Sequence, residues 1–271
     1  MIKQAIIPLA GLGTRLLPLT SVFPKELLPI NGKPGLEYIL DECNEAGINE
    51  IIFIISNKKQ LIKKYFYNDK FYKNIIKKKK DIRIKKEYKK ILKFKKKIKF
   101  VYQNKPLGTG DAVLKTKNLI KGSHFLMLFP DDLIMKKNCS KSMISIHNKH
   151  KCSVMASIKV NKEQVSRWGI YSIKKKLDKK NFLIKDVIEK PKKNIAPSNN
   201  AVIGRYILPK TIFKKLNNLK KGVGGEIHIT DAIRELINEN YKFVGHIFAG
   251  KYLDCGTMKG YINSSIKISK L

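Results

Sequence analysis

The sequence lacks any apolar run long enough to cross a membrane. A transmembrane helix needs about 20 consecutive apolar residues, whereas the longest clean apolar stretches here, such as 51–55, have the length of a buried β-strand. The first ten residues loosely resemble a signal peptide, but Pro8 interrupts their apolar part and two glycines follow, which favours a strand that enters a loop. We therefore expect no membrane partner. A hydrophobic fraction of 43% and an aromatic fraction of 9% also argue against a disordered chain.

Cysteine is scarce and scattered. The four cysteines, Cys43, Cys139, Cys152 and Cys255, lie far apart and form no Cys-x-x-Cys pair. This spacing argues against both a structural zinc site and a disulfide framework, and it is typical of a reducing compartment. We therefore expect a cytoplasmic protein.

Acidic residues and arginine are also few. The chain has 57 Lys and Arg against 21 Asp and Glu, a net charge of +36, yet it contains only five arginines. Proteins that read nucleic acids rely on arginine for bidentate contacts, so a lysine-filled surface explains the charge better than a specific nucleic-acid partner. The alternative, a basic polyanion-binding protein, would concentrate its binding in the lysine-rich stretch 74–97. The only aromatic residues there are Tyr88 and Phe94, too few for a stacking platform.

Strand-length apolar runs alternate with longer amphipathic stretches, which is typical of an α/β fold with a largely parallel sheet. We expect strands at 4–9, 50–55, 98–102, 124–129, 152–160, 169–173, 182–189, 201–208 and 242–248. We expect helices at 36–46, 60–66, 110–118 and 230–240, with a further one from Gly256. Gly47 is predicted to end the first helix and Thr230 to cap a later one. We interpret 74–97 as a solvated helical insertion, or otherwise a flexible loop. No Pro-, Gly- or Ser-rich linker divides the chain, so one domain covering 1–271 is expected.

A glycine loop follows the first strand and carries the first sign of phosphate chemistry. Gly11 and Gly13 allow a tight turn that presents N–H groups to an anion, and Arg15 adds a fixed cationic fork. Leu16 stands where a dinucleotide fingerprint needs its third glycine, and the Gly-Lys-Ser/Thr ending of a Walker A loop is missing. By itself, the Gly-x-Gly pair is equally explained by a tight turn.

A second cation comes ten residues later, in Pro24-Lys25-Glu26-Leu27-Leu28-Pro29. Lys25 lies close in sequence to Arg15, as the binding of a triphosphate would require. In a chain so rich in lysine, a single lysine is ordinarily a surface residue. The two motifs together, Gly-x-Gly-Thr-Arg-x-x-Pro and Pro-Lys-Glu-x-x-Pro, are much more specific than either alone.

These motifs resemble those of the bacterial UTP–glucose-1-phosphate uridylyltransferases, also called UDP-glucose pyrophosphorylases, within the sugar nucleotidyltransferase superfamily. The resemblance runs from Ala5 to about Tyr261 and is carried further by Leu128-Phe129-Pro130-Asp131, Val187-Ile188-Glu189-Lys190-Pro191, Gly225-Glu226-Ile227-His228-Ile229-Thr230-Asp231 and Asp254-Cys255-Gly256. It implies a Rossmann-like mixed, mostly parallel sheet flanked by helices, with the nucleotide on the N-terminal half and the sugar phosphate on the C-terminal half. It also implies a homo-oligomer.

The resemblance implies a role for each matching position. The residues that would hold the nucleotide are Ala10, Gly11 and Gly13, with Glu26, Gln103 and Gly108 near the base and ribose. The triphosphate would be bound by Arg15 and Lys25. The positions that would bind glucose 1-phosphate are Gly169, Glu189, Lys190 and Val202. Arg15, Lys25 and Lys190 would be the catalytic cations.

The resemblance also assigns Asp131 and Asp254 jointly to one Mg²⁺. Asp131 follows an apolar strand, at the place where open α/β sheets bind ligands. Mg²⁺ prefers oxygen ligands and usually takes one or two carboxylates together with substrate phosphates. Asp132 is expected to be a bystander, although the sequence alone leaves the roles of Asp131 and Asp132 interchangeable.

The implied reaction joins UTP to glucose 1-phosphate and releases pyrophosphate, by attack at the α-phosphorus. The nearest alternative is a thymidylyltransferase that uses dTTP, against which Glu26 argues because that family usually has glutamine there. A non-catalytic paralogue is a further alternative, although all the catalytic and metal positions are present. Two departures from the family pattern stand out: Asp111 occupies the histidine of Gly-Leu-Gly-His-Ala, and Trp168 replaces a common tyrosine. The first is expected to affect activity or base selectivity.

Overall fold

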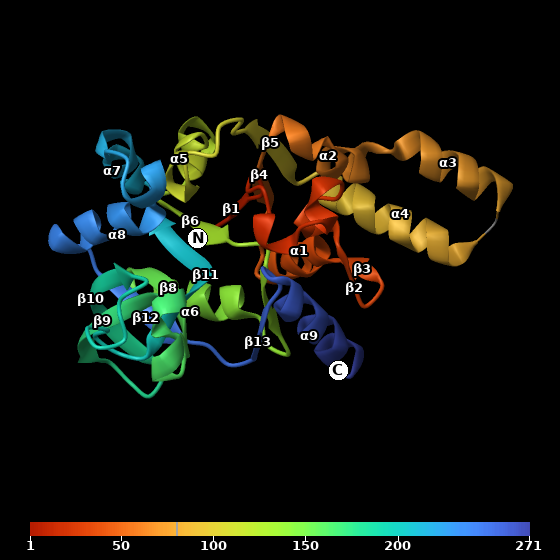
Figure 1. The fold of residues 1–271 in the computed structure, drawn as a ribbon. Coiled ribbons are helices and arrows are strands. Elements are labelled where there is room, and N and C mark those ends of the chain that lie inside the picture. The colour runs from red at the N-terminus through yellow and green to blue at the C-terminus, as the bar shows by residue number, and fades with distance from the viewer. Residues whose placement is uncertain (80) are drawn as a thin grey trace.

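Strands from both halves of the chain join one nine-stranded mixed sheet (Figure 1). The computed structural model describes residues 1–79 and 81–271. The strand order across the sheet is β5 (Ile98–Tyr102), β4 (Glu50–Ile55), β1 (Gln4–Pro8), β6 (His124–Leu128), β11 (Asn200–Pro209), β8 (Ser153–Lys159), β12 (Phe243–Ile247), β10 (Asn181–Glu189) and β9 (Gly169–Lys176).

The N-terminal part of the sheet is parallel, as expected. β1 pairs in parallel with both β4 and β6, and β4 pairs in parallel with β5. Strands of this kind are buried on both faces and read as continuous apolar runs. Residues 51–55 of β4 are indeed all buried.

The prediction of a mostly parallel sheet is wrong for the second half. β11 runs antiparallel to β6, β8 and β9, and β10 runs antiparallel to β12 and β9; only β8 and β12 pair in parallel there within the described residues. The connection between β9 and β10 covers only 177–180, and a link this short joins antiparallel strands, whereas parallel ones need a long crossover. A single β11–β9 pair, Ala201 with Ile170, closes this half of the sheet on itself.

The two large hydrophobic cores among the described residues lie on the two faces of the sheet. In β1, Ala5 and Ile7 face one core while Ile6 faces the other, because side chains alternate along a strand. The helices that contribute to the first core are α1 (Gly35–Glu45), α2 (Gln60–Tyr67), the end of α4 (Ile82–Lys95), α6 (Cys139–His150) and α9 (Met258–Ser269). Those that contribute to the second are α5 (Thr109–Leu114), α7 (Ile212–Asn218) and α8 (Ile229–Asn238).

The predicted helix ends have mixed outcomes. Gly47 follows the end of α1 with φ 78, which confirms its role as a stop. Thr230 is not the N-cap of α8, because the extended backbone at His228 places the cap there and Thr230 inside the first turn. Two short ribbons complete the described strands, β2 (Pro29–Ile30) with β3 (Lys33–Pro34) and β7 (Asp132–Met135) with β13 (Lys251–Asp254).

The lysine-rich stretch is helical, so of the two interpretations the helical one is confirmed and the flexible loop is wrong for the described residues. It belongs to two helices, α3 (Asp69–Lys78) and α4 (Ile82–Lys95), that extend away from the sheet as a hairpin (Figure 1). Asp81 caps α4 by accepting hydrogen bonds from the backbone of Arg83 and Ile84. Lys80 lies outside the described residues. No described helix combines the length and apolar character that a membrane span needs.

Candidate active site

The glycine loop lies at the carboxyl end of β1, next to the corresponding ends of β4 and β6. Gly13 has φ 74, a conformation that side chains disfavour, and its carbonyl accepts a hydrogen bond of 2.8 Å from the hydroxyl of Thr20. A short 3-10 turn, Thr14–Leu16, follows and carries Arg15. The loop therefore brings its backbone and one guanidinium to the edge where open α/β sheets bind ligands.

A cavity of about 430 Å³ opens at this edge. It is lined by all the residues predicted to bind the nucleotide and triphosphate, and by one predicted metal ligand: Ala10, Gly11, Gly13, Arg15, Lys25, Glu26, Gln103, Gly108 and Asp131. Residues from three separate parts of the chain thus meet at a single cavity.

A second cavity, of about 620 Å³, adjoins the first. Its lining includes the five remaining predicted site residues, Gly169, Glu189, Lys190, Val202 and Asp254. The residues common to both cavities are Arg15, Thr109, Phe129 and Asp131. The predicted nucleotide and sugar-phosphate positions therefore face each other across the Arg15–Asp131 boundary.

Asp131 is held between two cations at this boundary. Its Oδ2 lies 2.7 Å from the Lys25 ammonium and 3.8 Å from the Arg15 guanidinium. Burial would raise the pKa of Asp131, but Lys25 and, more weakly, Arg15 outweigh it and hold that pKa below its usual value. Burial would likewise lower the pKa of Lys25, which Asp131 and Glu26 instead raise. Both groups are therefore charged at neutral pH.

Asp254 is brought to the same place by the β7–β13 ribbon, in which it pairs with Asp132. Gly256 separates the two carboxylates. A Cβ atom placed on Gly256 would lie 2.8 Å from Asp131 Oδ2, 3.1 Å from the Arg15 guanidinium and 3.2 Å from Asp254 Oδ1, so the glycine leaves open a small space that both acids and Arg15 border.

This space suits Mg²⁺. Two carboxylates facing one point, next to a cavity large enough for phosphates, match the way in which Mg²⁺ is usually held. Among the described residues, no group of three or more His, Cys, Asp or Glu side chains forms a complete metal cage. The arrangement thus fits a cation that shares its ligands with a substrate.

Asp132 has its carboxylate occupied within the protein. One oxygen accepts a 2.8 Å hydrogen bond from the backbone N–H of Gly204, and the other accepts a 2.6 Å bond from the Tyr252 hydroxyl. Burial and the neighbouring Asp131 raise the pKa of Asp132 to about 6. These contacts fit the expected bystander role.

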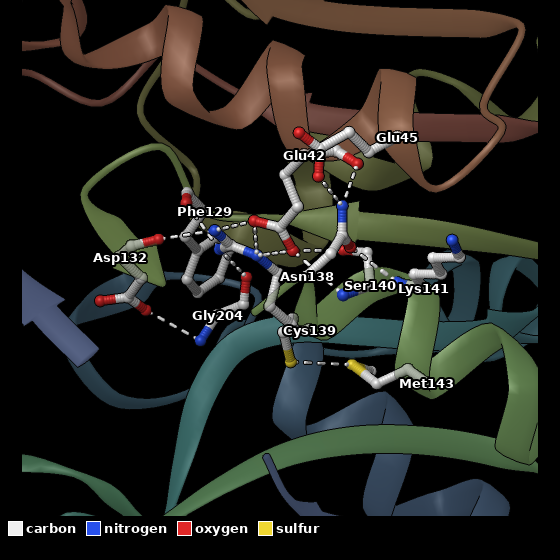
Figure 2. Close-up of polar contacts among 11 residues, drawn as sticks. Glu42, Glu45, Phe129, Asp132, Asn138, Cys139, Ser140, Lys141, Met143 and Gly204 are labelled. Carbon is white, nitrogen blue, oxygen red and sulfur yellow. Dashed lines mark hydrogen bonds and ion pairs between the residues drawn. The ribbon is translucent and has the colours of Figure 1, made fainter. Parts of the chain in front are cut away.

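A buried ion pair supports the backbone next to Asp131, and Figure 2 shows its acid, Glu42, beside Phe129 and Asp132. Arg205 is fully buried, and its guanidinium donates two bonds of 3.1 Å and one of 2.8 Å to the Glu42 carboxylate. It also donates to the carbonyls of Phe129 at 3.1 Å and Asp132 at 2.7 Å. Arg205 therefore holds the backbone on both sides of Asp131. No local pattern predicts this pair, because the two charges are 163 residues apart in the chain.

Glu26 is part of a second buried ion pair, which no motif of the sequence predicts. Only 3% of Glu26 is exposed, and its two carboxylate oxygens lie 2.7 and 2.8 Å from the Lys59 ammonium. Glu26 lines the first cavity as predicted, but its charge is already matched by Lys59. A lone lysine in so basic a chain offered no sign of this partner.

In the second cavity, Gly169 makes room for its neighbours. A Cβ there would lie 3.2 Å from Glu189 Oε2 and 3.3 Å from Val202. Lys190 adopts φ 45, its backbone N–H donates to Trp168, and its ammonium lies 3.9 Å from Glu189. Strained backbone of this kind is concentrated at functional sites.

Two further residues of the second cavity had no predicted role. Arg167 lies 3.9 Å from Asp254 Oδ2. Arginine is rare in this chain, with only five residues, and this rarity could have marked Arg167 as a candidate site residue. Tyr252 packs against Trp168 with ring centroids 5.8 Å apart. Trp168 itself lines the cavity.

A cation and an acid shared by two adjoining cavities, one of them at the edge of the parallel part of the sheet where α/β folds bind phosphates, define an enzyme that brings a nucleotide and a second anionic substrate together. Comparison with known proteins agrees with that class. The family model described as nucleotidyl transferase matches residues 4–270, and the chain belongs to that family.

Named relatives within the family are similar over nearly their full length. The UTP–glucose-1-phosphate uridylyltransferase of Bacillus subtilis is 35% identical, covering 99% of this chain and 91% of the relative. That of Mycoplasma pneumoniae is also 35% identical, covering 98% and 91%.

Solved structures of similar sequence have the same fold. A UDP-glucose pyrophosphorylase complexed with UDP-glucose is 36% identical with a TM-score of 0.88, covering 100% of this chain and 99% of the other. A UTP-bound enzyme of the same kind from Acinetobacter baumannii is 32% identical with a TM-score of 0.88, covering 99% and 93%.

Proposed function

We propose that this chain transfers the uridylyl group of UTP to glucose 1-phosphate, giving UDP-glucose and pyrophosphate. The observation that carries the proposal is the meeting of the two cavities at Arg15 and Asp131. The full-length similarity to uridylyltransferases, and to structures that bind UTP or UDP-glucose, supports the identity of the substrates.

In the proposed reaction, a phosphate oxygen of glucose 1-phosphate attacks the α-phosphorus of UTP. The bond from that phosphorus to the bridging oxygen breaks, and pyrophosphate leaves. The attacking oxygen is already anionic near neutral pH, so no general base is needed. The activation barrier comes from bringing two anions together and from the charge on the transferred group. Positioned cations lower this barrier.

Three cations of the site have a place in this scheme. Arg15 and Lys25, at the boundary and in the first cavity, would bind the triphosphate and stabilise the leaving pyrophosphate. Lys190, in the second cavity, would bind the sugar phosphate. Glu189, 44% exposed in that cavity, would accept hydrogen bonds from sugar hydroxyls.

The nucleotide would lie against the glycine loop. Backbone at Ala10, Gly11 and Gly13 would hold it, with Gln103 and Gly108 near the base. Strands of both halves share one sheet, which supports the proposal that the chain acts as one domain. Gly169 and Val202 would shape the wall against the sugar.

Asp131 and Asp254 would hold Mg²⁺ in this proposal. A bound Mg²⁺ neutralises phosphate charge at the reacting group. The supporting observation is the space at Gly256 that both carboxylates border. Asp132 would stay outside the coordination, since Gly204 and Tyr252 occupy its oxygens.

The test is pyrophosphate release by the purified protein with Mg²⁺ and glucose 1-phosphate, offered UTP, dTTP, CTP or ATP separately. We expect release with UTP well above the other three, abolished by EDTA. Release that favours dTTP would move the product to dTDP-glucose. No release with any nucleotide would refute the proposal.

A further inference from the structure

Gln103 and Asp111 form a buried pair at the wall of the first cavity. Gln103 follows β5 and Asp111 lies in the first turn of α5, and they are 7% and 6% exposed. The amide nitrogen of Gln103 donates a 2.8 Å hydrogen bond to Asp111 Oδ2 and a 3.0 Å bond to the carbonyl of Gly108. Gln103 borders the cavity, and Asp111 holds it from the side of α5.

These two bonds determine which way the amide faces. A glutamine amide nitrogen has two N–H donors, and here both have acceptors. If the amide were turned over, Oε1 would face a carboxylate and a carbonyl, two groups that only accept. No described residue donates to Oε1 in the observed orientation. The atom that Gln103 offers to a ligand is therefore a hydrogen-bond acceptor.

We propose that Asp111 is a positioning residue for base selection: it fixes the Gln103 amide with its oxygen toward the nucleotide base. An acceptor at that place matches the N3–H of uracil and opposes the unprotonated N3 of cytosine. The site would thus favour UTP over CTP without separating UTP from dTTP, whose base also carries N3–H. This inference rests on the proposed function, in which Gln103 lies near the base.

The acid itself matters for this role. A carboxylate can only accept from Gln103, whereas an asparagine of the same shape can donate or accept and so permits both amide orientations. The carbonyl of Gly108 would then be the only fixed acceptor facing the amide. Lys115, whose ammonium lies 3.5 Å from Asp111 Oδ1, touches the oxygen that Gln103 does not use.

The experiment compares kcat/KM for UTP and for CTP with saturating glucose 1-phosphate. In Asp111→Asn we expect the UTP-to-CTP ratio to fall about tenfold, on the order of one orienting hydrogen bond. Lys115→Ala is the matched control, because it changes charge beside Asp111 without touching the amide, and its ratio should stay within about twofold of wild type. A ratio does not depend on the fraction of folded protein, so loss of stability alone would not change it.

A double-mutant cycle tests whether Asp111 acts through Gln103. Gln103→Ala should lower the ratio, and adding Asp111→Asn should then lower it no further, because the two residues form one unit. Two results would overturn the proposal. In the first, the UTP-to-CTP ratio of Asp111→Asn stays within about twofold of wild type. In the second, Asp111→Asn lowers the ratio as much in the Gln103→Ala background as it does in wild type.

Failure of the proposed reaction would be recognised separately. Binding of UTP and of CTP is measured without the sugar phosphate, in wild type and Asp111→Asn. A UTP preference that Asp111→Asn loses would support the inference even if wild type releases no pyrophosphate. Equal binding of the two nucleotides by wild type would overturn it.

Discussion

The Lys25 ammonium lies 2.7 Å from Asp131 Oδ2, the same carboxylate that borders the space at Gly256. A cation and a proposed metal ligand are thus in direct contact, from positions 106 residues apart in the chain. Neither is fully enclosed, since 16% of the Lys25 side chain and 18% of the Asp131 side chain are exposed to solvent. This contact places the cationic and metal-binding parts of the proposed mechanism at one point.

Replacing Lys25 by alanine is expected to lower turnover about 100- to 1,000-fold, the usual effect of removing a positioned charge at a reacting phosphate. Lys33→Ala is the control, because Lys33 also pairs with a carboxylate, that of Asp41, but borders neither cavity. Pyrophosphate release measures both, and circular dichroism verifies the fold. Near-normal turnover of Lys25→Ala would remove Lys25 from the mechanism.

Asp131→Asn should lower turnover by a similar factor, about 100-fold or more, because it removes a charge that Mg²⁺ would need. Asp41→Asn serves as the control, because Asp41 also pairs with a lysine but borders neither cavity. Mg²⁺ binding by calorimetry in the presence of UTP provides a second readout, which should weaken only in Asp131→Asn. Unchanged Mg²⁺ affinity in that variant would argue that Asp132 or another group holds the metal.

Gly256→Ala tests the space between the acids. The added methyl would lie 2.8 Å from Asp131 Oδ2, closer than a Cβ normally approaches another atom, and 3.1 Å from the Arg15 guanidinium. The φ of Gly256 is not in the left-handed region, so alanine strains no backbone. We expect the Mg²⁺ concentration for half-maximal activity to rise about tenfold, on the order of one lost ligand contact. An unchanged Mg²⁺ response would show that the cation sits elsewhere.

The local elements were predictable from sequence, whereas their pairing was not. The strand at 50–55 was predicted with the bounds that the structure has, because an apolar run buried on both faces stands out. Nothing in composition distinguished parallel from antiparallel partners, so the second half of the sheet was misread. Its direction depends on short connections and on the closure of β11 against β9.

The residues of the candidate site likewise divide into those that sequence motifs predict and those that only the fold brings together. Residues in short motifs, such as Arg15, Lys25 and Asp131, were found because their neighbours in sequence signal phosphate chemistry, and all line the cavities. Lys59 and Arg205 were missed because each is defined by a distant carboxylate. Asp111 was noticed only as a departure from a pattern. Its contact with Gln103 depends on how α5 lies against the end of β5.

The Glu42–Arg205 pair carries a prediction about stability. Glu42→Ala would leave a fully buried guanidinium without its countercharge, a change that typically costs about 3–5 kcal/mol. Glu163→Ala is the control, because Glu163 and its partner Lys193 are both largely exposed and such pairs contribute about 1 kcal/mol or less. Urea unfolding measures both free energies. A loss below about 1 kcal/mol for Glu42→Ala would contradict a supporting role for the pair.

The lysine-rich hairpin offers the last prediction, which separates the enzyme from the polyanion-binding alternative. A groove between α3 and α4 is bordered by several lysines, among them Lys77, Lys85 and Lys89 of the lysine-rich stretch. Charges at the surface are screened beyond about 8 Å at physiological salt, so those on the hairpin should contribute little at the cavities. We therefore expect the triple change of these lysines to glutamine to leave turnover within about twofold of wild type at physiological salt, with a somewhat larger loss at low salt as steering of the anionic substrates weakens. Turnover measured across a salt series checks both parts. If the loss of activity persisted at high salt, the hairpin would take part in the reaction. The alternative function would be favoured by a different result: salt-sensitive binding of a polyanion that the triple change abolishes and that Asp131→Asn leaves intact.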